Sequence, residues 1–317
     1  MFCLPRKKRD VGVKSPVNPR WKAVRGWKHP EMHTVNSVRR VVRQGSFFLV
    51  AVMYILMIAL RTSPAQMIVA HRGASEAAPE NTLVAFNLAW KQDADAIEGD
   101  FHLTADRHIV AVHDRTTKRT SGIELEVAKS TLRQLQQLDV GQWKSARFRG
   151  QRIPTLGEVL ATVPENKKIL IEIKCGLEIV PELKEVLAGT NLQPRQTMVI
   201  SFNEHVVAAV KRAIPHVKVF WLTSYKQDES TGIWSPQIDQ VLDTLRRTGA
   251  DGLDTHANPA VVDAEFIQAV REEGHELHTW TVDDPKIARH YQRLGVDSIT
   301  TNRPRYIRDQ LKRPSTR

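Results

Sequence analysis

Side chains suited to acid–base and metal chemistry are concentrated between residues 71 and 114. His71-Arg72 and His113-Asp114 each follow a short apolar run, at the place where a buried strand would end. Between them, Glu98 and Asp100 lie two positions apart in a strand-like segment. Side chains alternate between the faces of a strand, so residues two apart share one face. We therefore expect these two carboxylates to point the same way, close to both imidazoles.

A second pair, Glu172 and Lys174, has the same spacing at the end of the apolar run 168–174. If Glu172 joins Glu98 and Asp100, three carboxylates crowd together and repel one another. A divalent cation removes that repulsion, and ligation by oxygen alone suits Mg²⁺ or Ca²⁺. The alternative is a salt-bridge network with Arg72 and Lys174 and no metal.

Two imidazoles flanking such a cluster can serve as general base and general acid, since the unperturbed pKa of histidine lies near neutrality. Arg72 offers a planar fork that matches phosphate oxygens, and Lys174 adds a point charge. Together with a cation, His71 and His113 then describe a site for a phosphate ester.

The elements that must position these groups alternate between strand and helix, which predicts a parallel sheet wrapped by helices. The segment 108–113 follows too short a turn for a helical crossover, so we expect it to fold back on 101–103 as a hairpin. Eight strand–helix units then remain, as in a TIM barrel, with the hairpin presenting His113 to the barrel mouth. Residues 115–153 form an insertion after the second strand, and its leucine spacing suggests one short helix at 132–138. The predicted strands are 67–71, 95–100, 108–113, 168–174, 197–201, 217–222, 251–254, 276–282 and 297–300, and the predicted helices 81–92, 155–163, 178–188, 203–214, 236–247, 263–273, 284–294 and 303–311.

The net charge of +11 is local to a basic leader, residues 1–65. That leader holds 13 lysines and arginines against two acids, whereas residues 66–317, the predicted barrel domain, hold 33 of each. The balanced body argues against a nucleic-acid partner. The chain has only two cysteines, Cys3 and Cys175, which excludes a disulfide framework or a thiolate metal site.

The leader contains an uncharged apolar run, residues 47–60, preceded by arginines and followed by small residues up to Ala65. Its length fits the apolar region of a signal peptide and falls short of a typical spanning helix. We expect either export with cleavage after Ala65 or an uncleaved membrane tether; a buried core helix is the third alternative. The barrel would then lie outside the cytoplasm, periplasmic, extracellular or membrane-anchored. The start codon, Met1 or Met32, and the oligomeric state stay open.

The chain resembles the glycerophosphodiester phosphodiesterase family. No single match is specific, but the matches follow the family order across most of residues 67–305. They are His71-Arg72-Gly73, Pro79-Glu80-Asn81-Thr82 with Ala85-Phe86, Glu98 and Asp100, Thr104 and Asp106, His113-Asp114 with Arg119-Thr120, Pro154-Thr155-Leu156, Glu172 and Lys174, Trp280-Thr281-Val282, and Thr301-Asn302 with Pro304.

The resemblance implies a TIM barrel with a divalent metal held by Glu98, Asp100 and Glu172. It also implies that His71 and His113 are the acid–base pair, and that Arg72 and Lys174 stabilise charge on phosphorus. A neighbouring glycerol hydroxyl would attack phosphorus, and water would open the cyclic ester to give glycerol 3-phosphate and an alcohol. Asn302 departs from the family, which often has aspartate there, and this puts a supporting contact in doubt.

Trp280 has two interpretations, an apolar wall beside the glycerol moiety or ordinary core packing. Two other functions stay open. One is a phospholipase D-like hydrolase of lysophospholipids or sphingomyelin on the same barrel. The other is a non-catalytic phosphate-binding scaffold, which the presence of both histidines and all three acids argues against.

Overall fold

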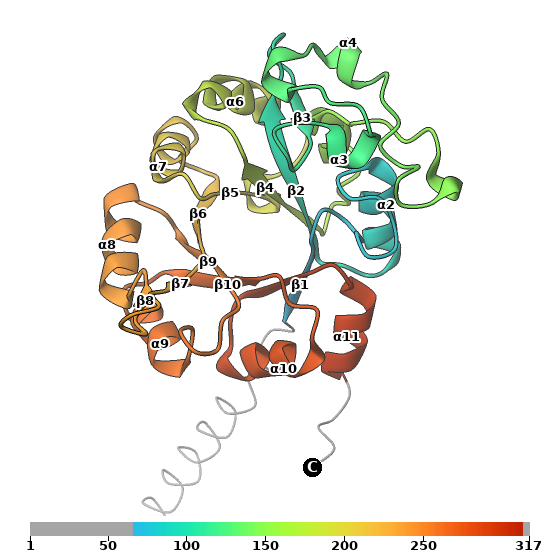
Figure 1. Cartoon of the computed structure of the whole chain (residues 1–317). Helices are drawn as coiled ribbons and strands as arrows, with labels where there is room; N and C mark the ends of the chain where they lie inside the picture. The colour runs from blue at the N-terminus through green and yellow to red at the C-terminus, as the bar shows by residue number, and fades with distance from the viewer. Residues whose placement is uncertain (1–65, 313–317) are drawn as a thin grey trace, which may run out of the picture. The chain divides into compact units, whose positions relative to one another are not determined.

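A computed structural model of the chain describes residues 66–312, which fold as a closed barrel of eight parallel strands with helices outside (Figure 1). The predicted TIM barrel is thus confirmed. β1 pairs with β11 on one side and β2 on the other, which closes the ring. The leader and residues 313–317 lie outside the described residues, and so does the prediction for 47–60. The barrel strands are β1 (Met67–Ala70), β2 (Ala96–Leu103), β4 (Lys168–Ile173), β5 (Thr197–Ser201), β6 (Lys218–Thr223), β9 (Gly252–His256), β10 (Glu276–Trp280) and β11 (Ser298–Thr301).

Eight helices follow the strands and cover the outside of the barrel, close to their predicted positions. They begin at strong capping signals in several cases. Thr155, for example, forms a reciprocal capping box with Glu158 at the start of α5. The helices are α2 (Leu83–Lys91), α5 (Leu156–Leu160), α6 (Val180–Ala188), α7 (Glu204–Ala213), α8 (Ile238–Thr248), α9 (Ala264–Glu272), α10 (Pro285–Leu294) and α11 (Pro304–Lys312).

The period of two along the strands divides the core into two layers. Inside the barrel, side chains from five strands form one apolar cluster: Val69, Ala96, Leu170, Met198, Ile200, Phe220 and Leu222. The alternate strand residues face the helices in a larger cluster, with members such as Ile97, Ile171 and Phe86. Because inward positions recur every second residue, the inward side of β2 continues from Ala96 to Glu98 and Asp100.

The predicted hairpin is confirmed, and it lengthens the second strand. β3 (Ile109–Ala111) runs antiparallel to β2, with Leu103 opposite Ile109. β2 therefore continues to Leu103 instead of ending at residue 100, because the partner strand satisfies its backbone beyond the barrel rim. A second hairpin, formed by the strands β7 (Lys226–Gln227) and β8 (Trp234–Ser235), was not predicted. Each of these strands has only two residues, which is too short to show a hydrophobic period.

The insertion after β3, residues 115–153, has a small buried core of its own that includes residues of the hairpin. Its predicted helix is present as α4 (Leu132–Leu135), shorter than the leucine spacing suggested, because Leu138 lies past its end. A second helix, α3 (Lys118–Ser121), was not predicted. Leucines and valines of the insertion bury against Val110 and Val112 of the hairpin, so the insertion fixes the segment that carries His113. The remaining elements are single 3-10 turns at Val127–Lys129, Ala146–Phe148, Leu177–Ile179 and Pro194–Gln196.

Candidate active site

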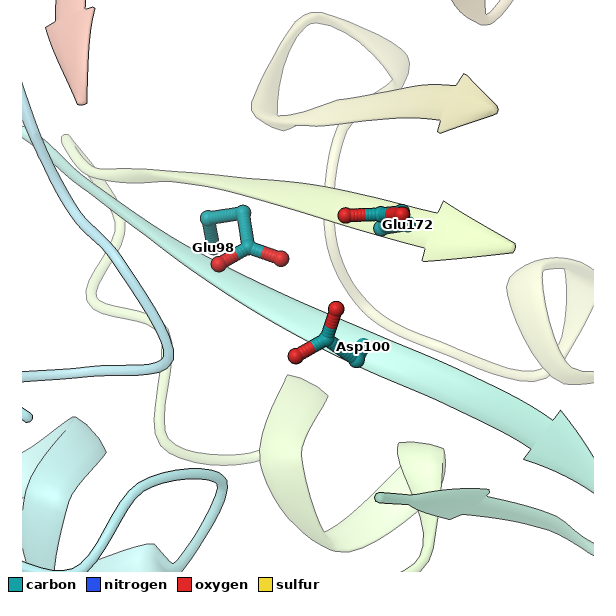
Figure 2. A group of neighbouring side chains, drawn as sticks. All are labelled: Glu98, Asp100 and Glu172. Carbon is teal, nitrogen blue, oxygen red and sulfur yellow. The ribbon is translucent and has the colours of Figure 1, made fainter. Parts of the chain in front are cut away.

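The three predicted acids meet at the mouth of the barrel. One ligand oxygen from each of Glu98, Asp100 and Glu172 lies within 4.8 Å of the others. Figure 2 shows Glu98 and Asp100 on β2 beside Glu172 on the neighbouring β4. The strand register explains the meeting, because Asp100 and Glu172 are direct partners in the β2–β4 pairing. All three are buried, and Glu98 Oε1 and Asp100 Oδ1 have no hydrogen-bond partner among residues 66–312.

The electrostatics of the cluster show how costly three adjacent carboxylates are. Burial, followed by repulsion from Asp100 and Glu172, raises the pKa of Glu98 well above its ordinary value. Burial and the charge of Asp100 raise the pKa of Glu172 to about 7. Burial also opposes ionisation of Asp100, but Arg72 and then Lys174 outweigh it and lower the pKa of that carboxyl. The protein therefore stabilises the ionised form of Asp100. The ionised forms of Glu98 and Glu172 are unfavourable unless a further positive charge lies beside them.

Arg72 and Lys174 both reach the acids, so the salt-bridge network considered for the sequence is present. Arg72 Nε lies 3.1 Å from Asp100 Oδ2, and Lys174 Nζ lies 2.7 Å from Glu172 Oε1. Arg72 is also bound to Glu80, at 2.9 Å, so its charge is shared with a fourth carboxylate. Lys174 Nζ approaches Asp100 Oδ1 only to 3.6 Å, so neither this oxygen nor Glu98 Oε1 receives a hydrogen bond within the described residues. Three buried carboxylates with free oxygens on one side fit a hard divalent cation, which Glu98, Asp100 and Glu172 would hold.

The loop after β1 is shaped to serve the acid cluster. Arg72 and Asn81 both adopt left-handed backbone angles, with φ of 54° and 56°. In that conformation the Arg72 amide donates to Glu98 Oε2 at 2.8 Å. Asn81 donates from its side chain to Asp100 Oδ2 at 2.8 Å and accepts from the Asp100 amide. Strained non-glycine backbone of this kind concentrates at functional sites.

His71 is held through Nδ1, which lies 2.7 Å from Asn302 Oδ1. The Asn302 amide nitrogen donates to Asp283 Oδ2 at 2.6 Å, which fixes the amide so that its oxygen faces the imidazole. Nδ1 must therefore carry a hydrogen, and Nε2 is left with a lone pair. Burial, followed by the charge of Arg72, lowers the pKa of His71, so its neutral form prevails at neutral pH. Asn302, the position at which a supporting contact was in doubt, thus makes a direct contact to His71.

His113 has a charged partner instead. Its Nδ1 lies 2.6 Å from Asp114 Oδ1, and Arg119 of α3 binds the other oxygen at 2.7 Å. Burial opposes ionisation of Asp114, but hydrogen bonds from Arg119 and His113 prevail and lower its pKa to about 2. Arg119 also binds Glu80, with contacts of 2.8 and 2.9 Å, so the insertion is connected to the loop that carries Arg72.

One cavity of about 230 Å³ is lined by all the predicted site residues except Asp100. Trp280 forms one of its walls, with its ring edge-on to Phe202 at 5.6 Å between centroids. Trp280 also packs against the inner apolar cluster, and its place beside a glycerol moiety stays a prediction. The lining residues are His71, Arg72, Glu98, His113, Glu172, Lys174, Ile200, Phe202, Leu222, Asp254, Trp280, Thr281 and Thr300.

The polar residues that support or line this site and were not predicted as functional from the sequence include Glu80, Asn81, Asp254, Asp283 and Thr300. Glu80 and Asn81 lie in a matched motif, but the sequence does not show which atoms they contact. Asp283 follows Val282 in a loop and gives no signal of its own. Asp254 lies inside the predicted strand 251–254, and a charged residue within a strand is the signal that could have drawn attention to it.

Comparison with known proteins identifies the family. A sequence model of the glycerophosphoryl diester phosphodiesterase family matches residues 71–306. The chain belongs to this family. Among its relatives, a glycerophosphodiester phosphodiesterase of Caldanaerobacter subterraneus subsp. tengcongensis is 32% identical over 243 residues, covering 75% of this chain and 94% of that protein. One from Bacillus subtilis is 30% identical over 254 residues, covering 74% and 83%.

Solved structures of this phosphodiesterase family superpose on the barrel. A glycerophosphodiester phosphodiesterase of Agrobacterium tumefaciens has a TM-score of 0.63 and 27% identity, covering 77% of this chain and 99% of its own. A phosphodiesterase of Oleispira antarctica, solved with the product sn-glycerol-3-phosphate, has a TM-score of 0.69 and 24% identity, covering 78% and 98%. Within residues 66–312, no helix is both long and apolar enough to cross a bilayer.

Proposed function

We propose that this family member hydrolyses glycerophosphodiesters to glycerol 3-phosphate and an alcohol, with one Mg²⁺ or Ca²⁺ as cofactor. The observation that carries the proposal is a single cavity lined by both imidazoles, two of the three clustered acids and both phosphate-binding cations. The names of the relatives support the substrate class. A divalent cation held by Glu98, Asp100 and Glu172 supplies positive charge to a phosphate oxygen when it is bound.

The partners of the two histidines divide the proton transfers between them. His71 is the general base, because Asn302 occupies its Nδ1–H and burial keeps Nε2 unprotonated. His113 is the general acid, because Asp114 Oδ1 accepts from its Nδ1 at 2.6 Å and leaves Nε2 as the ring nitrogen that delivers a proton. The two environments differ in the partner's charge, which assigns different roles to the same side-chain type.

The reaction then proceeds in two balanced steps. The glycerol hydroxyl next to the phosphoester gives its proton to His71 as its oxygen bonds to phosphorus, while His113 protonates the departing alcohol. A water molecule then attacks the cyclic ester with the proton transfers reversed, which yields glycerol 3-phosphate. Arg72 and Lys174 stabilise the negative charge that develops on phosphorus, and Trp280 forms the apolar wall beside the glycerol carbons.

A panel of purified substrates tests this function. Glycerophosphocholine and glycerophosphoethanolamine should release glycerol 3-phosphate, and exhaustive chelation should abolish the release until Mg²⁺ or Ca²⁺ is restored. Lysophosphatidylcholine and sphingomyelin belong in the same panel. Faster turnover of these two lipids would favour the phospholipase D-like alternative, and activity that survives chelation would contradict the cation site.

We propose that the leader exports or tethers the barrel outside the cytoplasm. The basic residues before the apolar run 47–60 and the small residues up to Ala65 support this proposal. Expression of the full chain in a bacterial host, followed by fractionation and N-terminal sequencing, should give either a mature end after Ala65 or a membrane-bound full-length chain. A soluble cytoplasmic protein that retains its leader would refute both forms.

A further inference from the structure

The deep side of the cavity carries two polar groups that the catalytic steps do not use. Asp254 on β9 is 1% exposed, and its Oδ1 has no hydrogen-bond partner within the described part of the chain. Thr300 on β11 is 2% exposed, and its Oγ1 is likewise without a partner there. Both residues line the active-site cavity. Their neighbours Ile200 and Leu222 are apolar and cannot satisfy them.

The titratable group beside Asp254 on the next strand is His278, which makes no hydrogen bond to the carboxyl group. His278 is the direct partner of Asp254 in the β9–β10 pairing. The imidazole bonds through Nδ1 to Ser298 Oγ at 2.8 Å, and its ring lies against Phe220, with 4.4 Å between centroids. Trp280 Nε1 donates to the backbone oxygen of Asp254 and so fixes the strand without reaching the carboxyl group.

An unpaired buried carboxyl is unfavourable for folding, so its place beside the catalytic groups calls for a ligand. Burial raises the pKa of Asp254 to about 6. The cavity is small for a ligand site, and its volume suits a glycerol phosphate rather than a larger lipid. The acids, Arg72 and Lys174 occupy the phosphate end. A carboxylate repels phosphate, so the group it receives is a hydrogen-bond donor elsewhere on the substrate, and the glycerol hydroxyls are the donors nearest to the phosphate.

We propose that Asp254 and Thr300 bind the terminal hydroxyl of the glycerol moiety, the one that does not attack phosphorus. This inference rests on the proposed function and specifies its substrate class: diesters whose glycerol carries a free terminal hydroxyl. The hydroxyl donates to Asp254 and accepts from Thr300, which satisfies both groups. A lysophospholipid esterified at that position has no hydrogen to donate and would bury the carboxyl unpaired. Asp254 thereby disfavours the lipid alternative by a polar mismatch, in addition to the small volume of the cavity.

The test compares glycerophosphocholine with 2-hydroxypropyl phosphocholine, which keeps the attacking hydroxyl and lacks the terminal one. We expect the wild-type enzyme to prefer glycerophosphocholine by about a hundredfold or more in kcat/KM, as sites that bind a substrate hydroxyl reject analogues without it. Asp254→Leu should reduce that preference below about tenfold, chiefly by raising KM for glycerophosphocholine. Calorimetry with glycerol 3-phosphate and propane-1,2-diol 1-phosphate should show the same loss of discrimination in binding.

Two further variants make the comparison decisive. Thr300→Val, which is isosteric, should lower the preference by about tenfold and decides the question if Asp254→Leu does not fold. Thr255→Val is the matched control, because Thr255 is the buried neighbour whose hydroxyl bonds Tyr225 at 2.7 Å; it should keep the full preference. Equal cleavage of both diesters by the wild-type enzyme, or equal loss on both in the Asp254 and Thr300 variants, would overturn the inference and leave the proposed function standing. If the wild type cleaves neither diester, the proposed function fails first.

Discussion

At the scale of single residues, chemistry is decided by the partner of each polar atom. His71 and His113 are the same side chain, yet one faces an amide oxygen and the other an ionised carboxylate. Glu98 and Asp100 are two positions apart, but burial and repulsion raise the pKa of Glu98 while two cations lower that of Asp100. The residue types indicate which side chains are candidates for the site, and the contacts of each side chain indicate how it would act there.

We predict that His113→Ala lowers turnover of glycerophosphocholine by at least about a hundredfold, because the departing alcohol loses its proton donor. The circular dichroism spectrum and melting temperature should stay close to wild type, since His113 is only partly buried. His108→Ala, an exposed histidine on the same hairpin, is the control and should retain full turnover. Near-normal turnover in the His113 variant would remove this residue from the mechanism.

At the scale of elements, several residues of the family motifs hold loops rather than perform chemistry. Thr82 caps α2 by accepting from the Ala85 amide, and Thr155 caps α5. Gly73 has a φ of 78°, and a Cβ atom there would lie 2.6 Å from the backbone carbon of Ala85. These residues set the path of the loop between β1 and α2, which aims Arg72 and Asn81 at the acids.

Gly73→Ala tests that close approach. We expect it to lower the free energy of unfolding by about 3 kcal/mol, from the left-handed backbone together with overlap against Ala85. Gly122→Ala is the matched control, because Gly122 has a similar φ of 76° but open space around its Cβ position. The Gly122 variant should lose about 1 kcal/mol of unfolding free energy, because only the left-handed backbone conformation is unfavourable for alanine there. Equal losses in urea unfolding would show that the contact with Ala85 is unimportant.

At the scale of the whole molecule, barrel closure through β1 and β11 brings His71 to Asn302, which lies far from it along the chain. It also places Asp254 inside a core where global unfolding must expose it. The raised pKa of about 6, against an ordinary 3.8, means that the fold favours the protonated acid. The protonated Asp254 therefore contributes to the free energy of unfolding. This contribution is fully present below about pH 4 and is lost as pH rises through 6.

Asp254→Asn should therefore change the pH dependence of stability. Asparagine does not titrate in this range. The free energy of unfolding of the variant, relative to that of the wild type, should therefore rise by on the order of 3 kcal/mol between pH 4 and pH 8, from a pKa shift of roughly two units in Asp254. Urea unfolding of both proteins at the two pH values measures the difference. A difference that does not vary with pH would show that Asp254 ionises as freely in the folded protein as in the unfolded one.

The sequence by itself determined the barrel and the acid cluster. Strand period, strand–helix alternation and the i, i+2 spacing of Glu98 and Asp100 are local patterns, and a period of two settles which side chains share a face. The hairpin was also predictable, because a four-residue turn excludes a crossover. The end of β2 at Leu103 was not, since it depends on pairing with β3.

Only the tertiary structure decided which atoms face each other across the site. Asn302 and Asp283 hold His71 although they lie more than 200 residues away from it along the chain. Arg119, which binds both Asp114 and Glu80, lies on the short helix α3, which the sequence pattern did not predict. The lack of a hydrogen-bond partner for Asp254 Oδ1 and Thr300 Oγ1 also follows only from the tertiary structure. A hydrogen bond depends on distances of tenths of an ångström between strands, whereas a sequence pattern specifies only the face on which a side chain lies.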